Sequence, residues 1–273
     1  MASRNGLNPK IRGPKGVGFG RALPAPFGFG NGIDPNGTGY LNIPALERSV
    51  PFPIEFTIEW WVDASINYLP PNFTASIFSI NDTINSKFLQ SDNFNGSVQG
   101  SASSASGYIY TGGSSIPPDA RVHIVLTHQL NSLPTVGATQ IFLNGSLSTT
   151  GNSLLSLPFN INRFLILAKA IGEADHNQPW RCKTDEVRVY RKILSPAEIA
   201  LNYNNHLGNN PSNTEHLLAW YQFERFENLD FSSLQDGSDI RVGIRDMSGN
   251  NNHGQQNGFN TDPLSDTYVL KPF

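Results

Sequence analysis

Cysteine, charged residues and long apolar runs are all scarce in this sequence of 273 residues. The single cysteine, Cys182, excludes an internal disulfide and argues against a typical secreted animal protein. Charged residues make up only 15% of the sequence and the formal net charge is -3. The overall charge therefore does not favour binding to nucleic acid or to an acidic membrane. No eighteen consecutive residues are apolar, and no apolar run follows the basic residues of the first segment. We therefore expect neither a membrane span nor a signal peptide.

The sequence also lacks the patterns that glycosidases, serine hydrolases and zinc sites use. Retaining glycosidases need two carboxylates roughly 5–5.5 Å apart, and no E-x-D-x-E run supplies them. Glu55 and Glu59 share one face of an extended strand, but a spacing of four residues separates them by about 13 Å. No G-x-S-x-G turn, H-x-x-x-H pair or second cysteine is present. We expect no enzyme, and we expect Glu55, Glu59 and Asp63 to be solvated.

The sequence contains 25 glycines and 19 prolines, a composition that suits many strands joined by tight turns. Apolar residues at positions 54, 56, 58 and 60 alternate with Glu55, Thr57, Glu59 and Trp61, so one face of this strand should be buried. Asn144-Gly145 between two β-rich runs predicts a hairpin. The Ser/Gly-rich region 91–115 predicts a long loop or an irregular edge. Further expected strands cover residues 39–45, 74–80, 106–111, 121–129, 139–149, 162–170, 185–190 and 216–228.

A strand at 185–190 runs directly into a sharply delimited helix. Ser195 offers an N-cap hydroxyl, Pro196 suits the first helical position, and Glu198 completes a capping box. Gly208 can end the helix in the left-handed conformation. The expected apolar side of the helix consists of Ile193, Leu194, Ile199, Leu201 and Tyr203.

The run DEVRVY followed by LSPAEI resembles the closing segment of laminin-G-like, concanavalin-A-like jelly-roll domains. The order of the earlier segments is similar to the same family: GYLNIP, FTIEWWV, RVHIVLTHQ, IFLNGSL and FLILAKA. The resemblance covers residues 35–205. It implies an all-β fold, a concanavalin-A-like jelly-roll β-sandwich with one short helix near 195–207.

Two parts of the chain depart from that pattern. Residues 1–33 form a basic arm rich in glycine and proline, and residues 34–273 form the sandwich. Within the sandwich, residues 214–260 contain an apolar strand and a D-x-S-G-N-x-N-H-G turn, which usually open such domains. They follow the closing helix here, so we expect a permuted or appended closing segment of the same sandwich instead of a second unit.

The basic arm either packs along its own domain or is held by a neighbouring subunit, and we favour the neighbour because the arm has little apolar surface. The expected partners are other virion proteins or copies of the chain itself. A contact with nucleic acid is the weaker interpretation, because no aromatic side chains are interleaved with the charges. The arm residues expected to bind a partner are Arg4, Lys10, Arg12, Lys15 and Arg21.

Calcium is the metal that the sequence favours, because hard cations take oxygen ligands from acidic turns. The resemblance implies a structural calcium at Asp185, joined by Asp34 of an early loop. Asp246 with Asn250 is a third acidic turn. The alternative is that these side chains only stabilise turns by bonding to the backbone.

The resemblance also implies carbohydrate binding, in which an exposed aromatic ring stacks on a sugar. The candidates are Trp61, on the strand face opposite Trp60, and the loop-side residues Tyr68, Tyr110 and Trp180. For Trp61, a sheet face covered by a loop or a neighbour is an equally good explanation.

The leading hypothesis is a non-enzymatic structural or adhesive component of a larger assembly. A bacteriophage virion is the expected setting, as a head decoration, head fibre or tail appendage made in the host cytoplasm, with host glycans as a further partner. The second hypothesis is a free-standing, calcium-dependent lectin. The third is a divergent glycoside hydrolase, which requires two carboxylates that converge on the concave sheet.

Overall fold

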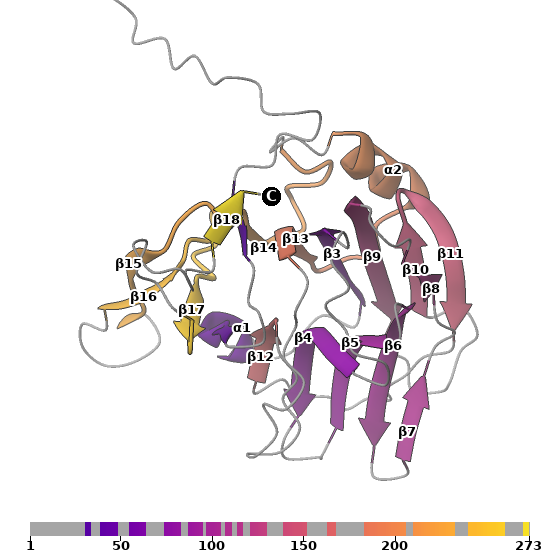
Figure 1. Cartoon of the computed structure of the whole chain (residues 1–273), viewed down its shortest axis with the longest axis horizontal. Helices are drawn as coiled ribbons and strands as arrows, with labels where there is room; N and C mark the ends of the chain where they lie inside the picture. The colour runs from indigo at the N-terminus through magenta and orange to yellow at the C-terminus, as the bar shows by residue number, and fades with distance from the viewer. Residues whose placement is uncertain are drawn as a thin grey trace, which may run out of the picture.

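The computed structural model forms a two-layer β-sandwich with a helix packed outside one sheet (Figure 1). The residues that the structure describes are 31–33, 39–48, 55–63, 74–82, 87–94, 97–104, 107–110, 114–116, 121–129, 139–151, 163–167, 183–205, 210–232, 240–259 and 270–272. Among these residues both sheets are antiparallel throughout. The expected all-β sandwich is confirmed.

The first sheet, sheet A, has the strand order β11-β10-β9-β3-β13-β1-β18. Strand β13 is central to it, because β3 occupies one edge of β13 while β1 and β14 share the other. The strands of sheet A are β1 (Asn31–Ile33), β3 (Glu55–Asp63), β9 (Arg121–Gln129), β10 (Thr139–Leu143), β11 (Ser146–Gly151), β13 (Lys183–Tyr190), β14 (Leu217–Tyr221) and β18 (Leu270–Pro272).

The second sheet, sheet B, has the order β15-β16-β17-β2-β12-β4-β5-β6-β7, with β8 paired to β6. Its strands are β2 (Tyr40–Asn42), β4 (Thr74–Asp82), β5 (Lys87–Phe94), β6 (Ser97–Ser104), β7 (Gly107–Tyr110), β8 (Ser114–Ser115), β12 (Arg163–Ile166), β15 (Glu227–Asp230), β16 (Ile240–Ile244) and β17 (Gly254–Asn257). The late strand β17 pairs with the early strand β2, so the C-terminal segment extends sheet B while β14 extends sheet A.

The main core lies between the two sheets and includes residues of β2, β3, β4, β9, β12, β13 and β14. On β3 the inward residues are Phe56, Ile58, Trp60 and Val62, as the alternation predicts. A second, smaller cluster lies on the outer face of sheet A, beneath the helix α2 (Pro196–Asn204), and includes Tyr190. Sheet A is therefore buried on both faces where α2 covers it.

Helix α2 begins as its sequence predicts. The Ser195 side chain accepts a hydrogen bond from the Glu198 backbone N–H, and the Glu198 carboxylate accepts one from the Ser195 N–H. The helix ends at Asn204, where the N–H of Asn205 caps the Leu201 carbonyl, and Gly208 lies outside the described residues. Leu201 is 48% exposed, so its assignment to the buried side was wrong; the polar Asn202 is buried instead.

Three further differences from the sequence predictions concern strands and a second helix. Region 91–115 contains the predicted strand, β7, and lies at an edge of sheet B, but it also contains the end of β5 and the strands β6 and β8 where a loop was an alternative. Pairing with neighbouring strands satisfies a Ser/Gly-rich backbone that has weak strand propensity. Strand β12 stops at Ile166, where Leu167 adopts a positive φ of 68°. A short helix, α1 (Pro44–Arg48), follows β2.

The predicted hairpin at Asn144-Gly145 is confirmed. Both residues have positive φ, 49° and 77°, and they join β10 to β11. The turn also packs against α2: a Cβ added to Gly145 would lie 3.2 Å from atoms of Tyr203 and 3.3 Å from the Cα of Ala200. Glycine at this position thus serves both the turn conformation and the seating of the helix.

Replacing Gly145 by alanine should therefore destabilise the protein by about 2–3 kcal/mol, from the left-handed backbone and from crowding against α2. The matched control is Gly249→Ala, because Gly249 also has a positive φ, 88°, but has nothing within 4 Å of an added Cβ. This control should cost only about 1 kcal/mol. Urea unfolding of both variants measures the difference, and equal losses would show that the contact with the helix is unimportant.

Candidate functional site

The outer face of β3 carries polar side chains that α2 covers. Glu59 is 1% exposed, so the expectation that it is solvated was wrong. Glu55 and Asp63, at the two ends of the strand, stay partly exposed. The physical reason is tertiary: the chain after β13 folds back over this face and removes it from water.

Thr57 fastens that return segment to the sheet. Its hydroxyl donates to the backbone carbonyl of Lys192 at 2.7 Å and accepts from the N–H of Leu194 at 3.0 Å. These two bonds fix the start of α2 directly over β3. The helix then points Ile199, Asn202 and Tyr203 toward the sheet, a spacing of three and four that defines one helix face.

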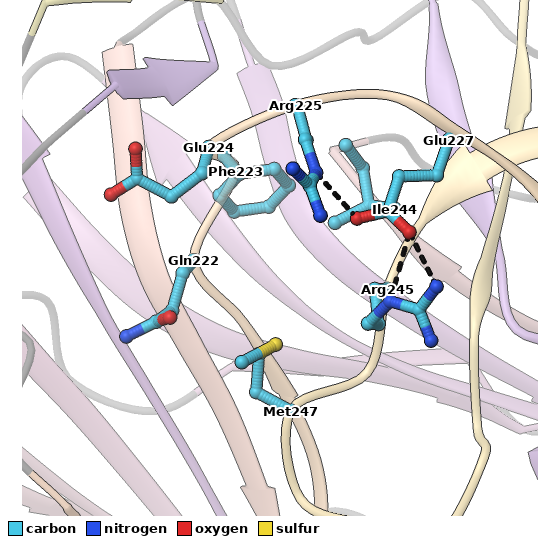
Figure 2. Close-up of a pocket in the computed structure, with 8 residues that line it drawn as sticks. All are labelled: Gln222, Phe223, Glu224, Arg225, Glu227, Ile244, Arg245 and Met247. Atoms are coloured by element: carbon cyan, nitrogen blue, oxygen red, sulfur yellow. Dashed lines mark hydrogen bonds and ion pairs between the residues drawn. The ribbon is translucent and has the colours of Figure 1, made fainter. Parts of the chain in front are cut away.

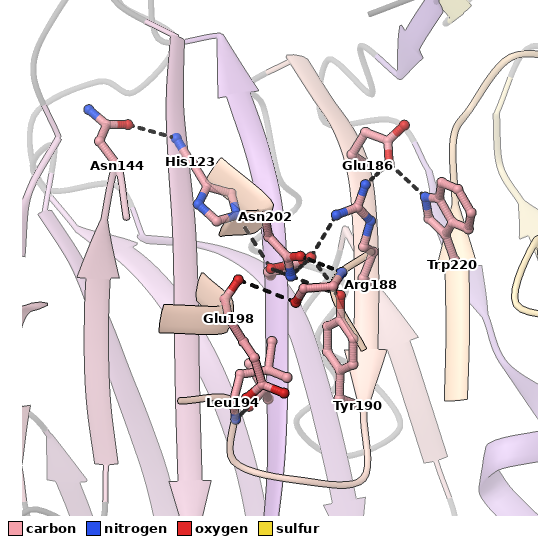
Figure 3. A network of polar contacts seen from close by, with 12 residues as sticks. His123, Asn144, Glu186, Arg188, Tyr190, Leu194, Glu198, Asn202 and Trp220 are labelled. Carbon is pink, nitrogen blue, oxygen red and sulfur yellow. Dashed lines mark hydrogen bonds and ion pairs between the residues drawn. The ribbon is translucent and has the colours of Figure 1, made fainter. Parts of the chain in front are cut away.

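The carboxylate of Glu59 is the centre of a buried network. Figure 3 shows its partners Arg188, Tyr190 and Asn202. The carboxylate accepts hydrogen bonds from Arg188 Nη1 at 2.9 Å and from the Tyr190 hydroxyl at 2.8 Å. Asn202 Nδ2 lies 3.0 and 2.9 Å from its two oxygens, and Asn202 Oδ1 accepts from the N–H of Ser212. One carboxylate therefore joins β3, β13, α2 and the segment that follows α2.

Arg188 links Glu59 to a second buried carboxylate, Glu186. Its Nη2 donates to Glu186 Oε2 at 2.7 Å, and its guanidinium lies 5.1 Å from the centre of the Trp220 ring. Trp220 Nε1 and Gln222 Nε2 also donate to Glu186, at 2.6 and 3.1 Å. Glu186 sits at a β-bulge with a positive φ of 53°, an unusual backbone for this residue type.

The buried charges shift the pKa of Glu59. Burial by itself raises that pKa, but His123, Arg188 and the hydrogen bond from Asn202 outweigh it and lower the value from 4.5 to about 2. His123 Nε2 lies 3.4 Å from Glu59 Oε2, which is long for a hydrogen bond, so we assign its effect to charge and dipole. Glu59 is therefore ionised across the ordinary pH range.

This network is closed to any large ligand. The side chains of Glu59, Arg188 and Glu186 are all buried, and α2 covers Glu59 through Asn202. A polysaccharide cannot reach either carboxylate in this arrangement. What the arrangement can do is hold α2 and the bulge of β13 in one geometry.

The predicted sugar-stacking residues do not come together among the described residues. Trp61 is 2% exposed, because Tyr203 of α2 stacks on it with ring centres 5.7 Å apart. The covered-face interpretation therefore holds for Trp61, and the open ring that sugar stacking requires is not available there. Tyr110 belongs to β7, with its side chain outside the described set, and Tyr68 and Trp180 lie outside the described residues.

The predicted calcium site is only partly within the described residues. Asp185 is buried, and burial together with the charge of Glu186 raises its pKa well above the ordinary value. Its Oδ1 accepts from the Glu186 N–H at 2.7 Å. In the part of the chain that the structure describes, no three His, Cys, Asp or Glu residues are placed to hold a metal ion. Asp34 lies outside the described residues, so the calcium site stays a prediction.

The third acidic turn acts as a backbone clamp. The Asp246 carboxylate accepts from the N–H groups of Trp220, Ser248 and Asn252 and from the Ser248 hydroxyl. Asn250 and Asn252 donate to backbone carbonyls of β14. The turn interpretation of Asp246 with Asn250 is confirmed, and the turn ties the C-terminal segment to sheet A.

A surface hollow of about 300 Å³ lies between the end of β14 and the ends of β15 and β16 (Figure 2). Glu227 binds two arginines beside it: Arg225 Nε donates to Oε1 at 2.7 Å, and Arg245 Nε donates to Oε2 at 2.9 Å. The other residues that line the hollow include Phe223 and Met247. The sequence prediction did not include this hollow, and only the run ERFE near the permuted strand was a signal for it.

The network residues Arg188, Glu186 and Asn202 were also absent from the predicted sites. Arg188 and Tyr190 alternate with buried valines on β13, a weak signal that this strand is buried on both faces. The arm residues Arg4, Lys10, Arg12, Lys15 and Arg21 lie outside the described residues, so their role stays a prediction. Within the described residues, no helix is long and apolar enough to cross a membrane.

The two sheets, the interior core and the covering helix define a lectin-like β-sandwich. The chain belongs to the concanavalin A-like lectin/glucanases superfamily, whose family model matches residues 35–200, more than half of the chain. Among curated proteins, none matches this chain in sequence.

Solved structures share the fold at low identity. A candidate carbohydrate binding protein from Bacteroides ovatus is 16% identical with a TM-score of 0.50, over 88% of this chain and 62% of that one. The SAP-like pentraxin of Limulus polyphemus is 14% identical with a TM-score of 0.42, over 62% and 82%. Domains LG4-5 of the mouse laminin α1 chain are 8% identical with a TM-score of 0.41, over 61% and 43%. At these identities the similarity concerns the fold alone.

Removing Arg188 should leave two buried carboxylates without their cation. We expect Arg188→Met to lower the free energy of unfolding by about 3–5 kcal/mol. The matched control is Arg225→Met, because Arg225 is 75% exposed in its ion pair with Glu227, and exposed pairs contribute about 1 kcal/mol or less. Urea unfolding measures both, and similar losses would contradict a structural role for the buried network.

The lowered pKa of Glu59 predicts a pH-dependent contribution to stability. Because the folded-state pKa lies below 4.5, the carboxylate contributes fully above about pH 4.5, and its contribution is lost as the pH falls toward 2. The difference in unfolding free energy between the wild-type protein and Glu59→Gln should shrink by about 3 kcal/mol over that range. Urea unfolding at a series of pH values measures it, and a constant difference would overturn the assignment.

Proposed function

We propose that this chain is a non-catalytic carbohydrate-recognition module that serves as a structural or adhesive component of a larger assembly. The observation that carries the proposal is the closure of the outer face of sheet A. Glu59 and Glu186 are buried and paired with Arg188 there, so neither is presented to a polysaccharide. A rigid sandwich with a covered face suits binding or support better than hydrolysis.

The junction between the arm and the sandwich supports an anchoring role. Strand β1, Asn31–Ile33, is formed by the last three residues of the arm and pairs with both β13 and β18 in sheet A. A force or a contact applied to the arm is therefore transmitted into the strand that carries the buried network.

The distribution of charge along the sequence supports a second copy of the chain as the partner of the arm. The first 33 residues contain five basic and no acidic residues, while the whole chain contains 19 basic and 22 acidic ones. The remaining 240 residues thus have 14 basic and 22 acidic residues. The arm of one copy and the body of a neighbour are complementary in charge. A virion, as a head decoration, head fibre or tail appendage, is the setting that we propose for such copies, with host glycans as the external ligand.

Light scattering on the full-length protein and on a variant without residues 1–30 tests the anchoring role. We expect the full-length chain to assemble and the truncated chain to be a folded monomer. Two monomers, or two equal assemblies, would contradict anchoring by the arm.

Binding and catalysis are tested separately on the full-length protein. A glycan array with and without added calcium should show binding, and binding that requires calcium would favour a calcium-dependent lectin. Release of reducing ends from laminarin would overturn the proposal of a non-enzyme.

A further inference from the structure

The hollow beside β15 and β16 lies outside residues 35–200, the part of the chain that matches the family model. It belongs to the C-terminal segment, and two kinds of surface face each other across it. Figure 2 shows Arg225, Glu227 and Arg245 on one side, with Gln222 and Glu224 on the other. This placement distinguishes the hollow from a simple gap between surface loops.

The guanidinium groups are oriented by the carboxylate between them. Glu227 receives Arg225 through Nε, which leaves the two terminal amino groups of that side chain for another partner. The Glu227 carboxylate also accepts hydrogen bonds from Nε and Nη2 of Arg245, which leaves Nη1 of Arg245 for another partner. The Glu227 side chain is largely buried while that of Arg225 is 75% exposed. The carboxylate therefore fixes the position of the Arg225 and Arg245 guanidinium groups, whose remaining N–H groups are accessible.

The opposite side is anchored to the buried network. Gln222 donates through Nε2 to Glu186 Oε1 at 3.1 Å, which leaves its carbonyl oxygen as an acceptor. The next residue, Phe223, is fully buried with a positive φ of 49°, a conformation that costs about 1–3 kcal/mol in a bulky residue. Strain of this kind is retained where the surrounding structure fixes the residue, and Phe223 is held in the buried core.

An apolar surface lies between the two polar sides. Phe223 and Ile244 line it from within the core, and Met247 is 47% exposed beside them. Because Phe223 and Ile244 are buried, the accessible apolar patch consists of the Met247 side chain, with donors on one side and acceptors on the other. The lining is more polar than that of a typical small-molecule pocket, and a volume of about 300 Å³ is at the small end of the range of such pockets.

The charges of the hollow decide the chemical class of the ligand. The lining contains two guanidinium groups and two carboxylates, so it has no formal net charge. An anion would meet Glu227 between the arginines, and a cation would meet the arginines themselves. Hydroxyl groups both donate and accept, so a neutral polyol satisfies both sides while its C–H face covers the apolar patch.

We propose that this hollow binds one neutral sugar unit of a glycan, held by Arg225 and Arg245 on one side and by Gln222 and Glu224 on the other. The proposal rests on the carbohydrate-recognition function proposed above and gives that function a location. The sugar would lie against Met247, outside the covered face of sheet A.

Methionine labelling gives a local test, because the chain contains two methionines, Met1 and Met247. The full-length protein with ¹³C-methyl methionine is titrated with neutral probes (lactose, maltotriose and chitotriose) and acidic probes (sialyllactose and trigalacturonate), beside calorimetry on the same samples. We expect a neutral probe to shift the Met247 methyl signal saturably and to leave the Met1 signal unchanged. Arg225→Leu should weaken this binding by about tenfold or more. The matched control Arg191→Leu, at an exposed arginine outside the hollow, should leave it unchanged.

The other outcomes separate the two proposals. Neutral-sugar binding by calorimetry with an unmoved Met247 signal, or with unchanged affinity in Arg225→Leu, would overturn the hollow as the site and keep the recognition function. An acidic probe that binds at Met247 in preference to the neutral ones would overturn the neutral class. Absence of binding by every probe would overturn the carbohydrate-recognition function and this site with it.

Discussion

The carboxylate of Glu59 is the interaction on which the rest of this sandwich depends. A charge on the outer face of a sheet is ordinarily solvated, but here Arg188, Tyr190 and Asn202 replace the water. Desolvation of an ion is tolerated only when its partners are well placed. The network therefore requires that β3, β13 and α2 keep one relative arrangement, and it excludes arrangements in which the helix lies elsewhere.

The outer face of sheet A is closed, whereas the hollow in the C-terminal segment is accessible. Gln222 bonds to Glu186 of the network, and the Asp246 turn clamps β14, so the region around the hollow is attached to sheet A at two points. Strand β17 meanwhile pairs with β2 of sheet B. The segment that departs from the family's usual order thus joins both layers, and it carries an accessible concave surface on a rigid base.

Predictions from sequence succeeded where the determining forces are local and failed where they are not. The N-cap of α2 and the Asn144-Gly145 turn depend on a few neighbouring residues, and both are confirmed. Leu201 and Glu59 were misplaced because burial of a helix side or an outer sheet face depends on what packs there. The hollow was missed because Arg245 is brought to Glu227 and Arg225 by the pairing of β15 with β16.

The sequence by itself determined the all-β class, the jelly-roll family, the start of α2 and the strand with one buried face. Periodicity, turn type and helix capping depend on residues that are close in sequence, so they can be predicted without tertiary information. Only the tertiary structure decided that Trp61 lies under Tyr203, that Glu59 is paired instead of solvated, and that a polar hollow forms at the C-terminal edge. Each of these depends on contacts between segments far apart in the chain, and residue type alone does not specify which distant surfaces meet.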